Sequence, residues 1–479
     1  MSQYAGGGVI RRSEEIPIAG EFDVIVCGGG VAGVAAAASA ARAGAQTLLL
    51  ERTNTLGGTA TGTLMSLSVI PFNSAHGFPR ELYQRIGERG GLVEAEVTPW
   101  DPEAYKLAAA ELVEASGATL LLNTWVSAPL VEDGWLRGVI VENKSGRQAY
   151  LAKIVIDSSG DCDVAARAGV KYVVGRESDQ AMRPLTVMGR LANVDLVRLS
   201  EYVKSHPDDF GKDDSRKVVD VERGIVRVDG FYSVVDQGKR DGIIEADVPV
   251  NYLRFSGIVQ GDPRHTDLIC NSTRIYGVDG TDALALTHAE IEGRRQLNGI
   301  VEAIKRYLPG FEKSYLIETS NQIGVRETRR IEGLYTLTDR DILDGVSFED
   351  SVAAMPSRNY GTAEVHGPDP GEGGKSDRWA REMSLNTIFF DFPYRCLIPQ
   401  GLHNVLVAGR CVSVSHDADR FVRNQVPAAL TGQAAGVAAA LCVKSGASCR
   451  QAPISEIQRV LRESGVFIHR EDVPEKAYH

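Results

Sequence analysis

The sequence predicts an α/β fold: a Rossmann-like domain with a β-meander, and a second, α+β domain inserted in it. Three observations predict this arrangement. A glycine-rich turn lies between an apolar strand and a helix of small residues at 22–37. Short β segments separated by turn residues follow at 119–151. A buried strand and another helix of small residues, at 403–440, return the chain to the first domain.

The glycine-rich turn is the most informative of the three. It contains Gly28, Gly30 and Gly33, and the strand after its helix ends in Glu51. In this motif the first glycine permits a tight turn, the second lets the backbone approach a pyrophosphate, and the third lets helix and strand pack closely. The pyrophosphate binds the free N–H groups of the helix start, and the acid accepts hydrogen bonds from a ribose. We predict a dinucleotide site; the alternative is a glycine turn in an unrelated α/β protein.

The composition is that of a soluble globular protein with two domains. The chain has 479 residues, which is long for one core, and a net charge of −11 with no block of Lys or Arg. Nucleic-acid binding is not expected as a main task, because phosphate contacts dominate that affinity. An anionic substrate would need a local basic pocket against the overall charge.

The cysteines and the apolar runs give expectations about location. Seven cysteines are scattered, odd in number and without a CxxC pair, which argues against a disulfide framework and a zinc site. We expect no metal. The first 20 residues hold no apolar signal segment, and no run of 18 apolar residues occurs. We therefore expect no membrane association and a cytoplasmic location.

The pattern along the chain predicts how the two domains are interleaved. A helix is expected at 101–116, capped by Asp101, and a long amphipathic helix is expected to end at Pro309. The Gly- and Pro-rich stretch 359–377 is expected to be a loop. The expected division is a dinucleotide-binding domain at 1–175 and 385–450, a substrate domain at 176–384, and a C-terminal helix and tail at 451–479.

FAD is favoured over NAD by the return of the chain at 403–440. FAD lies extended, so its flavin end meets segments that are distant in sequence. The strand that ends at Gly409 and the helix expected to start at Thr431, whose N-terminus can face the flavin, give that arrangement. A simple NAD-binding dehydrogenase is the alternative.

Two further stretches, 324–331 (GVRETRRI) and 393–399 (PYRCLIP), lie outside the generic nucleotide motif. With them, the sequence resembles the broad bacterial family of FAD-dependent oxidoreductases that have a glutathione-reductase-like FAD domain. The resemblance spans nearly the whole chain. The matching stretches are 23–33, 51–52, 56–61, 154–166, 324–341, 392–399, 405–411 and 432–436.

The resemblance implies an FAD site and a substrate domain over the flavin face. The residues it implies at FAD are Gly28, Gly30, Val31, Ala32, Gly33, Glu51, Arg52, Gly57, Gly58, Thr59, Ala60, Thr61, Val126, Ser159, Gly160, Asp161, Gly409, Arg410, Gln433 and Ala435. One stretch, 417–427, departs from the family. It keeps Arg423 but replaces small neighbours with charged ones, Asp419 and Arg420 among them. This favours a polar or ionic pocket wall and leaves the substrate unassigned.

Candidate catalytic residues are histidines and arginines. A general base should titrate near neutral pH, which favours histidine. The candidates are His416, which follows the C-terminal glycine, and His366, on the Gly/Pro loop; His76 is a weaker candidate. In each case the alternative is a packed histidine or a turn residue. Arg395 and Arg423 are expected to contact substrate or flavin.

Arg326, Arg329 and Arg330 could clamp a carboxylate or form ion pairs with Glu327 and Glu332. Cys396 and Cys411 could link to a flavin, but small buried residues are favoured at both positions. The chain is thus expected to be an FAD-dependent dehydrogenase or reductase. It would move a hydride between flavin N5 and a small polar organic substrate, and it could form a homo-oligomer. The alternatives are an oxidase or monooxygenase that uses O₂, and a non-catalytic flavin-binding or assembly protein.

Overall fold

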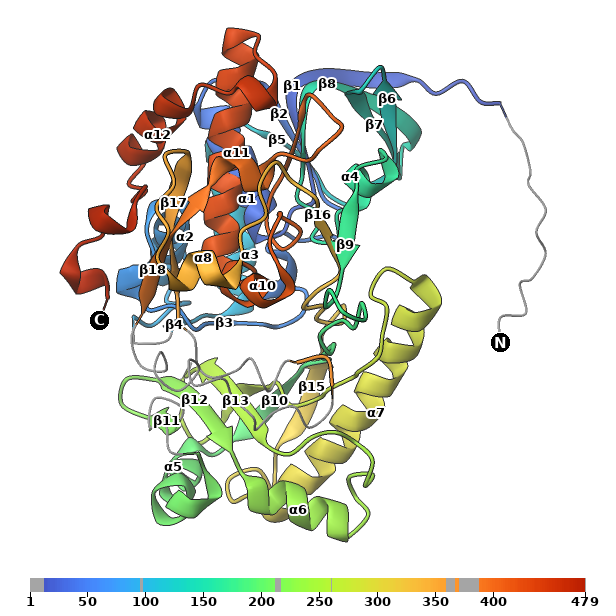
Figure 1. Ribbon diagram of the computed structural model, residues 1–479. Helices are drawn as coiled ribbons and strands as arrows, with labels where there is room; N and C mark the ends of the chain where they lie inside the picture. Colours follow the sequence, from blue (N-terminus) through green and yellow to red (C-terminus); the bar gives the residue numbers. More distant parts are fainter. Residues whose placement is uncertain are drawn as a thin grey trace.

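The computed structural model describes residues 13–94, 98–211, 217–259, 261–358, 367–369 and 387–478. Figure 1 shows two parts, one above the other: a layered α/β domain that contains most of the N- and C-terminal chain, and a smaller domain built from the middle of the sequence. The predicted insertion of one domain in the other is confirmed, because residues from both ends of the chain share a hydrophobic core.

A mixed sheet forms the centre of the first domain. Its strands, in the order β5-β2-β1-β8-β7-β6 with β19 also beside β8, are parallel except for the β6–β7–β8 meander. The bounds are β1 (Ile18–Cys27), β2 (Thr47–Leu50), β5 (Thr119–Leu121), β6 (Trp125–Glu132), β7 (Trp135–Asn143), β8 (Gly146–Asp157) and β19 (Val405–Val407). The meander predicted between the parallel strands is therefore present.

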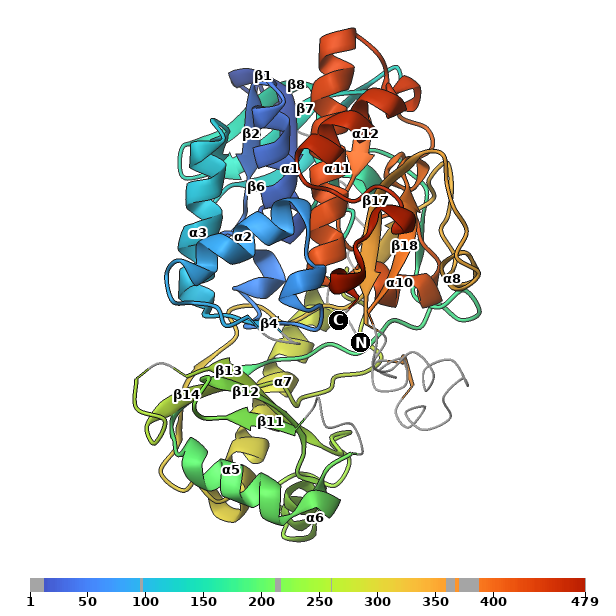
Figure 2. The same ribbon diagram turned by 90° about the vertical axis from the view of Figure 1, so that its left-hand side faces the viewer.

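Two helices rich in small residues pack against each other beside this sheet, as both views show (Figures 1 and 2). They are α1 (Val31–Arg42) and α11 (Gln425–Ser445). A Cβ atom at Gly432 or Gly436 would overlap the carbonyl of Ala32 or Ala36, so only glycine permits this approach. By length and composition alone α11 could cross a membrane, but 94% of its most apolar window is buried inside the protein, where it forms part of the core.

The second domain is an antiparallel sheet with helices packed on one face. Its strand order is β11-β12-β13-β14-β10-β15. The elements are β10 (Gly189–Val194), α5 (Leu196–Ser205), β11 (Lys217–Asp220), β12 (Ile225–Gly230), α6 (Tyr232–Arg240), β13 (Leu253–Ile258), β14 (Thr266–Cys270), α7 (Ala283–Tyr307) and β15 (Tyr315–Thr319). The predicted amphipathic helix is α7, which ends two residues before Pro309.

The boundary of the second domain differs from the expected one. Its core comprises residues from 185 to 323, whereas the side chains of β17 and β18 join the core of the first domain. β17 and β18 belong to the first domain because their hydrophobic side chains join its core and β17 packs on α11. The remaining elements of the first domain are α2 (Gly77–Gly87), β3 (Leu67–Ser68), β4 (Thr98–Pro99), α3 (Pro102–Ala115), α4 (Asp163–Arg167), β9 (Tyr172–Val174), β16 (Arg329–Ile331), α8 (Asp339–Leu343), β17 (Ser351–Ser357), β18 (Ile388–Pro393), α10 (His416–Val422) and α12 (Ile454–Glu463).

Candidate functional site

A single cavity runs from the carboxyl ends of the parallel strands to the sheet of the second domain. Its empty volume, open mouth included, is about 2400 Å³. One half is lined by the glycine-rich turn and the ends of β1, β2, β8 and β19, and the other half by polar residues of both domains. Ligands of open α/β sheets bind at this edge of the sheet.

The first turn has the geometry that its glycines predict. Gly28 has φ +108°, and a Cβ there would lie 2.6 Å from the carbonyl oxygen of Ser158. A Cβ at Gly33 would overlap the carbonyl of Gly28, so α1 packs against the turn only because position 33 is glycine. Gly30 has no atom closer than 4.0 Å to an added Cβ and lines the cavity.

The start of α1 is prepared for an anion. Gly30 is its N-cap and no side chain caps the helix. Val31 and Ala32, the first two helical residues, line the cavity. Uncapped N–H groups and the positive end of the helix dipole favour a phosphate at this position.

Glu51 connects the turn to the second strand. Its carboxylate accepts hydrogen bonds from the N–H of Gly29 at 2.6 Å, and from the N–H and hydroxyl of Thr53 at 2.7 and 2.8 Å. A carboxylate has about four lone-pair sites, so these three bonds leave room for one more donor, such as a ribose hydroxyl. Glu51 also lines the cavity.

The second glycine cluster packs directly on the first. Gly57 and Gly58 have φ of +105° and +55°, and a Cβ at Gly58 would lie 2.9 Å from the Cα of Gly30. Gly58 and Thr59 line the cavity. Gly57, Ala60 and Thr61 do not; the hydroxyl of Thr61 donates to the carbonyl of Leu56 and fixes the loop from behind.

The loop after β8 forms the next wall. Ser159, Gly160 and Asp161 line the cavity, and Arg410 holds them by donating to the carbonyl of Gly160 at 2.7 Å and to the carboxylate of Asp161. Asp157 fixes the loop from beneath, a role that we did not predict.

Asp157 is fully buried, and its carboxylate accepts from the N–H groups of Ser159, Val164 and Ala165 at 2.8–3.0 Å. Burial, the dominant effect, raises its pKa against these bonds. An acid at the end of a buried strand, just before a short helix, was the available sequence signal.

The other predicted cofactor residues divide into two groups. Arg52, Val126, Gly409 and Arg410 line the cavity. Gln433 and Ala435 do not, because the helix expected to start at Thr431 starts at Gln425, which places both residues in its buried interior. The side-chain oxygen of Gln433 accepts from the N–H of Phe78 at 2.8 Å and so joins α11 to α2.

The sequence model of the family described as FAD dependent oxidoreductase matches residues 23–461. The chain belongs to this family. It is an FAD-dependent oxidoreductase, and the uncapped start of α1, the open space at Gly30 and the remaining acceptor capacity of Glu51 fit an FAD in this half of the cavity.

Solved structures of similar fold include a geranylgeranyl bacteriochlorophyll reductase-like protein from Thermoplasma acidophilum, with 13% identity, 94% of this chain and 86% of that chain covered, and TM-score 0.45. The p-nitrophenol 4-monooxygenase from Pseudomonas putida has 13% identity, with 95% and 87% covered and TM-score 0.45. The myxobacterial chondrochloren halogenase has 14% identity, with 92% and 79% covered and TM-score 0.45.

The second half of the cavity of this oxidoreductase is rich in arginine. Arg227 lies on β12 and Arg254 on the neighbouring strand β13, and both side chains are buried. We did not predict either residue; a charged residue within an otherwise apolar strand was the signal. The arginines that line this half are Arg183, Arg227, Arg254, Arg326, Arg358, Arg420 and Arg423.

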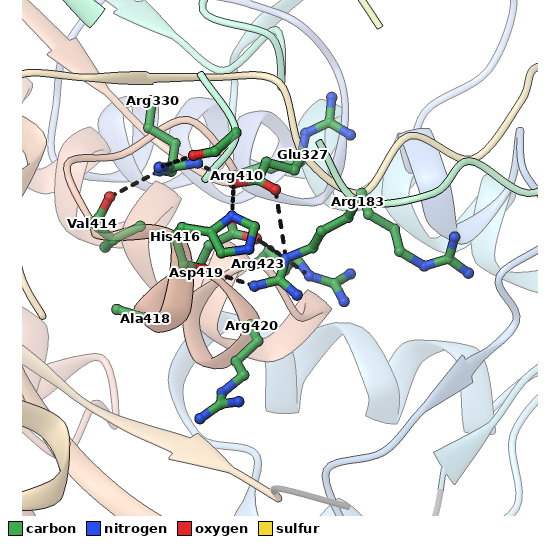
Figure 3. A network of polar contacts seen from close by, with 12 residues as sticks. Arg183, Glu327, Arg330, Arg410, Val414, His416, Ala418, Asp419, Arg420 and Arg423 are labelled. Atoms are coloured by element: carbon green, nitrogen blue, oxygen red, sulfur yellow. Dashed lines mark hydrogen bonds and ion pairs between the residues drawn. The ribbon is translucent and has the colours of Figure 1, made fainter. Parts of the chain in front are cut away.

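A buried network of charges lies behind this half (Figure 3). Glu327 accepts a hydrogen bond from Arg330 and lies 2.8 Å from Nδ1 of His416 and 3.6 Å from Nε of Arg183. Asp419 lies 3.5 Å from Arg183 and 3.5 Å from Nε of Arg423.

The two buried acids of this network have pKa values shifted in opposite directions. Burial opposes ionisation of Glu327, but the hydrogen bond with His416 and the charge of Arg183 outweigh it and lower its pKa. Burial and the charge of Glu327 raise the pKa of Asp419.

The predicted catalytic residues are not brought together. Arg423 lines the cavity. His416 is the first residue of α10 and lies behind the lining, with its Nδ1 2.8 Å from the Glu327 carboxylate, so a catalytic role for it stays a prediction. Arg395 also lies away from the lining, because it forms a surface ion pair with Asp350 at 2.9 Å. His366 lies outside the described residues.

The weaker candidates have structural positions. His76 is buried and its Nε2 lies 2.8 Å from the carbonyl oxygen of Ala354. Cys396 and Cys411 are buried, free thiols outside the cavity lining, the state favoured from the sequence. Within the described part of the chain, no group of three or more His, Cys, Asp or Glu residues is placed to hold a metal ion.

Proposed function

We propose that this FAD-dependent oxidoreductase moves a hydride between the flavin and a small polar organic substrate bound in the arginine-rich half of the cavity. The observation that carries the proposal is the continuity of the cavity, which joins the nucleotide-binding half to a chamber lined by buried polar side chains. Bound FAD supplies the hydride chemistry; the chain supplies binding, orientation and electrostatics.

Two amides in the chamber support a substrate with hydrogen-bond donors. Gln425 and Asn271 line the cavity, and the side-chain oxygen of each is buried without a hydrogen-bond partner in the described structure. The amide of Gln425 has a fixed orientation, because its nitrogen donates to the carbonyl of Met65 at 2.9 Å. A buried acceptor without a donor is unfavourable, so a hydroxyl or amino group of the substrate would satisfy it.

Arg423 supplies a positive charge at the same wall. It lies between α10 and α11, and its ion pair with Asp419 limits where its guanidinium can move. We propose that it orients an electronegative group of the substrate. Among the described residues that line the cavity there is no histidine, so transfer of the substrate proton by His366 stays a prediction.

The test begins with the absorption spectrum of the pure protein before and after acid precipitation. Flavin absorbance released into the supernatant would show non-covalent FAD. Hydroxy and amino compounds are then screened by anaerobic bleaching of the flavin band. We expect R423M to bind FAD normally and to lower the second-order rate of flavin reduction about 10- to 100-fold, the effect of losing a hydrogen bond to a charged group.

Arg395→Met is the matched control, because Arg395 is an arginine of the same C-terminal segment that lies away from the cavity. It should leave the rate unchanged. Bleaching by NAD(P)H alone, with no response to any polar organic compound, would contradict the proposal and favour a monooxygenase. Reoxidation by air within the time of mixing would favour an oxidase.

A further inference from the structure

One arginine of the chamber, Arg326, has no carboxylate beside it among the residues that the structure describes. The Arg326 side chain is buried, with 9% of its surface exposed, and lines the cavity. Its one hydrogen bond in the described structure is donated by Nη1 to the backbone carbonyl of Pro184. Arg254, by contrast, pairs with both oxygens of Asp229 at 2.8 Å.

The charges around Arg326 are positive. Burial lowers its pKa well below the usual value, and the nearby guanidinium groups of Arg274 and Arg423 lower it further. A guanidinium remains protonated in proteins, so its charge must be balanced by a partner or remain costly. The described residues supply no carboxylate at this position, although they supply carboxylates to Arg254 and Arg330.

Arg423 is only partly balanced. Within the described residues Asp419 is the carboxylate that pairs with it, and that carboxylate lies equally far, 3.5 Å, from Arg183. Burial lowers the pKa of Arg423 to about 10 despite the charge of Asp419. Arg326 and Arg423 line one cavity, and the charge of Arg423 acts on Arg326. Because the described carboxylates balance these two guanidinium groups only in part, the pair forms a site for an anion.

We infer that the substrate carries an oxyanion, a carboxylate or a phosphate, which binds between Arg326 and Arg423 and completes the ion pair that the fold leaves open. The inference rests on the proposed function and narrows its substrate class. Together with the free acceptors of Gln425 and Asn271, it favours an organic acid that also carries a hydroxyl or amino group.

The inference is tested by thermal unfolding of the FAD-loaded protein with added anions. Acetate and succinate represent carboxylates, and inorganic phosphate represents phosphate esters; sodium chloride of equal ionic strength is the control. We expect one of the oxyanions to raise the unfolding temperature beyond chloride. We expect Arg326→Met to weaken that anion about 10- to 100-fold, and Arg326→Lys to restore part of the binding.

The same variant separates a binding role from a structural one. Because the charge of Arg326 is buried without a carboxylate, R326M without anion should unfold at a temperature no lower than the natural protein. R330M, which leaves the buried Glu327 short of a partner, should unfold at a clearly lower temperature. A loss of stability in R326M as large as that in R330M would overturn the inference.

Equal shifts by chloride and the oxyanions, or an unchanged shift in R326M, would also overturn it. The proposed function can fail independently. If an oxyanion binds through Arg326 but no organic acid bleaches the flavin, the anion site stands and hydride transfer to such a substrate does not. If a neutral substrate bleaches the flavin equally in R326M, hydride transfer stands and the anion site does not.

Discussion

Protonation of His76 should destabilise the fold in mildly acidic solution. Its Nε2 donates to the carbonyl of Ala354 on β17, its Nδ1 accepts from the N–H of Phe467 at 3.3 Å, and its ring packs on that phenylalanine with centroids 4.8 Å apart. Both bonds need the neutral ring with the proton on Nε2. Burial lowers its pKa from 6.5 to about 4, and the bond to Ala354 opposes the shift only in part.

The sign follows from proton binding. Between pH 6.5 and 4 the unfolded chain holds a proton on this imidazole and the folded chain does not, so the free energy of unfolding falls as the pH is lowered through this window. At about 1.4 kcal/mol for each pH unit, the loss is on the order of 3 kcal/mol. Above pH 6.5 the contribution is constant.

The assay compares the natural protein with His76→Gln, whose amide nitrogen can still donate to Ala354 but which does not titrate. Urea unfolding of both proteins is measured from pH 4 to pH 8. The difference in unfolding free energy between them should decrease with falling pH below 6.5 and be flat above it. A difference that is independent of pH would show that His76 is not the group that titrates.

Three further outcomes are expected. Gly33→Ala should raise the dissociation constant of FAD about 5- to 150-fold, because the new Cβ meets the carbonyl of Gly28 and overpacking costs about 1–3 kcal/mol. Gly87→Ala, whose Cβ meets nothing within 4 Å, should leave FAD binding unchanged, and equal binding by both variants would refute the packing argument. Asp157→Asn should also weaken FAD binding, because an amide NH₂ cannot accept hydrogen bonds from the two N–H groups of α4 that the carboxylate oxygen now accepts. FAD binding is measured by fluorescence titration, and an unchanged dissociation constant would show that the loop keeps its position without these hydrogen bonds. Glu327→Gln should lower the unfolding free energy by about 3–5 kcal/mol in urea, because it leaves buried arginines short of a partner, and a loss below about 1 kcal/mol would contradict that account.

The parts of the fold predicted well from sequence are those set by neighbouring residues. The close packing of α1 on the first turn was predictable, because the carbonyl that a Cβ at Gly33 would meet belongs to Gly28 of the same strand–turn–helix unit. The helix at Pro102–Ala115 was predictable for the same reason, since Asp101 accepts from the N–H groups of its own first turn. By contrast, the carbonyl that a Cβ at Gly28 would meet comes from Ser158, which is distant in sequence.

The features that could not be predicted from the sequence depend on contacts between residues that are distant in the chain. Nothing local in 351–357 distinguishes a strand of the second domain from one that packs on α11. Arg395 and Arg423 lie in the same C-terminal segment, yet one pairs with Asp350 on the surface and the other faces the cavity. His416 follows the turn at Gly409 at the expected distance in sequence, but its side chain is directed to Glu327 (Figure 3).

The segment 324–330 explains how the two halves of the cavity are held together. The carbonyl of Val325 accepts from Arg410, and the hydroxyl of Thr328 donates to Asp161 at 2.7 Å, so both residues support the wall of the FAD half. Arg326, between them, faces the arginine-rich chamber, and Glu327 enters the buried network behind it. Successive residues of one short stretch therefore contact the cofactor wall, the chamber and the buried network. An anion bound by Arg326 would therefore be held by a backbone that is fixed to the wall of the FAD half at Val325 and Thr328. The position of the substrate would then depend on the position of the flavin.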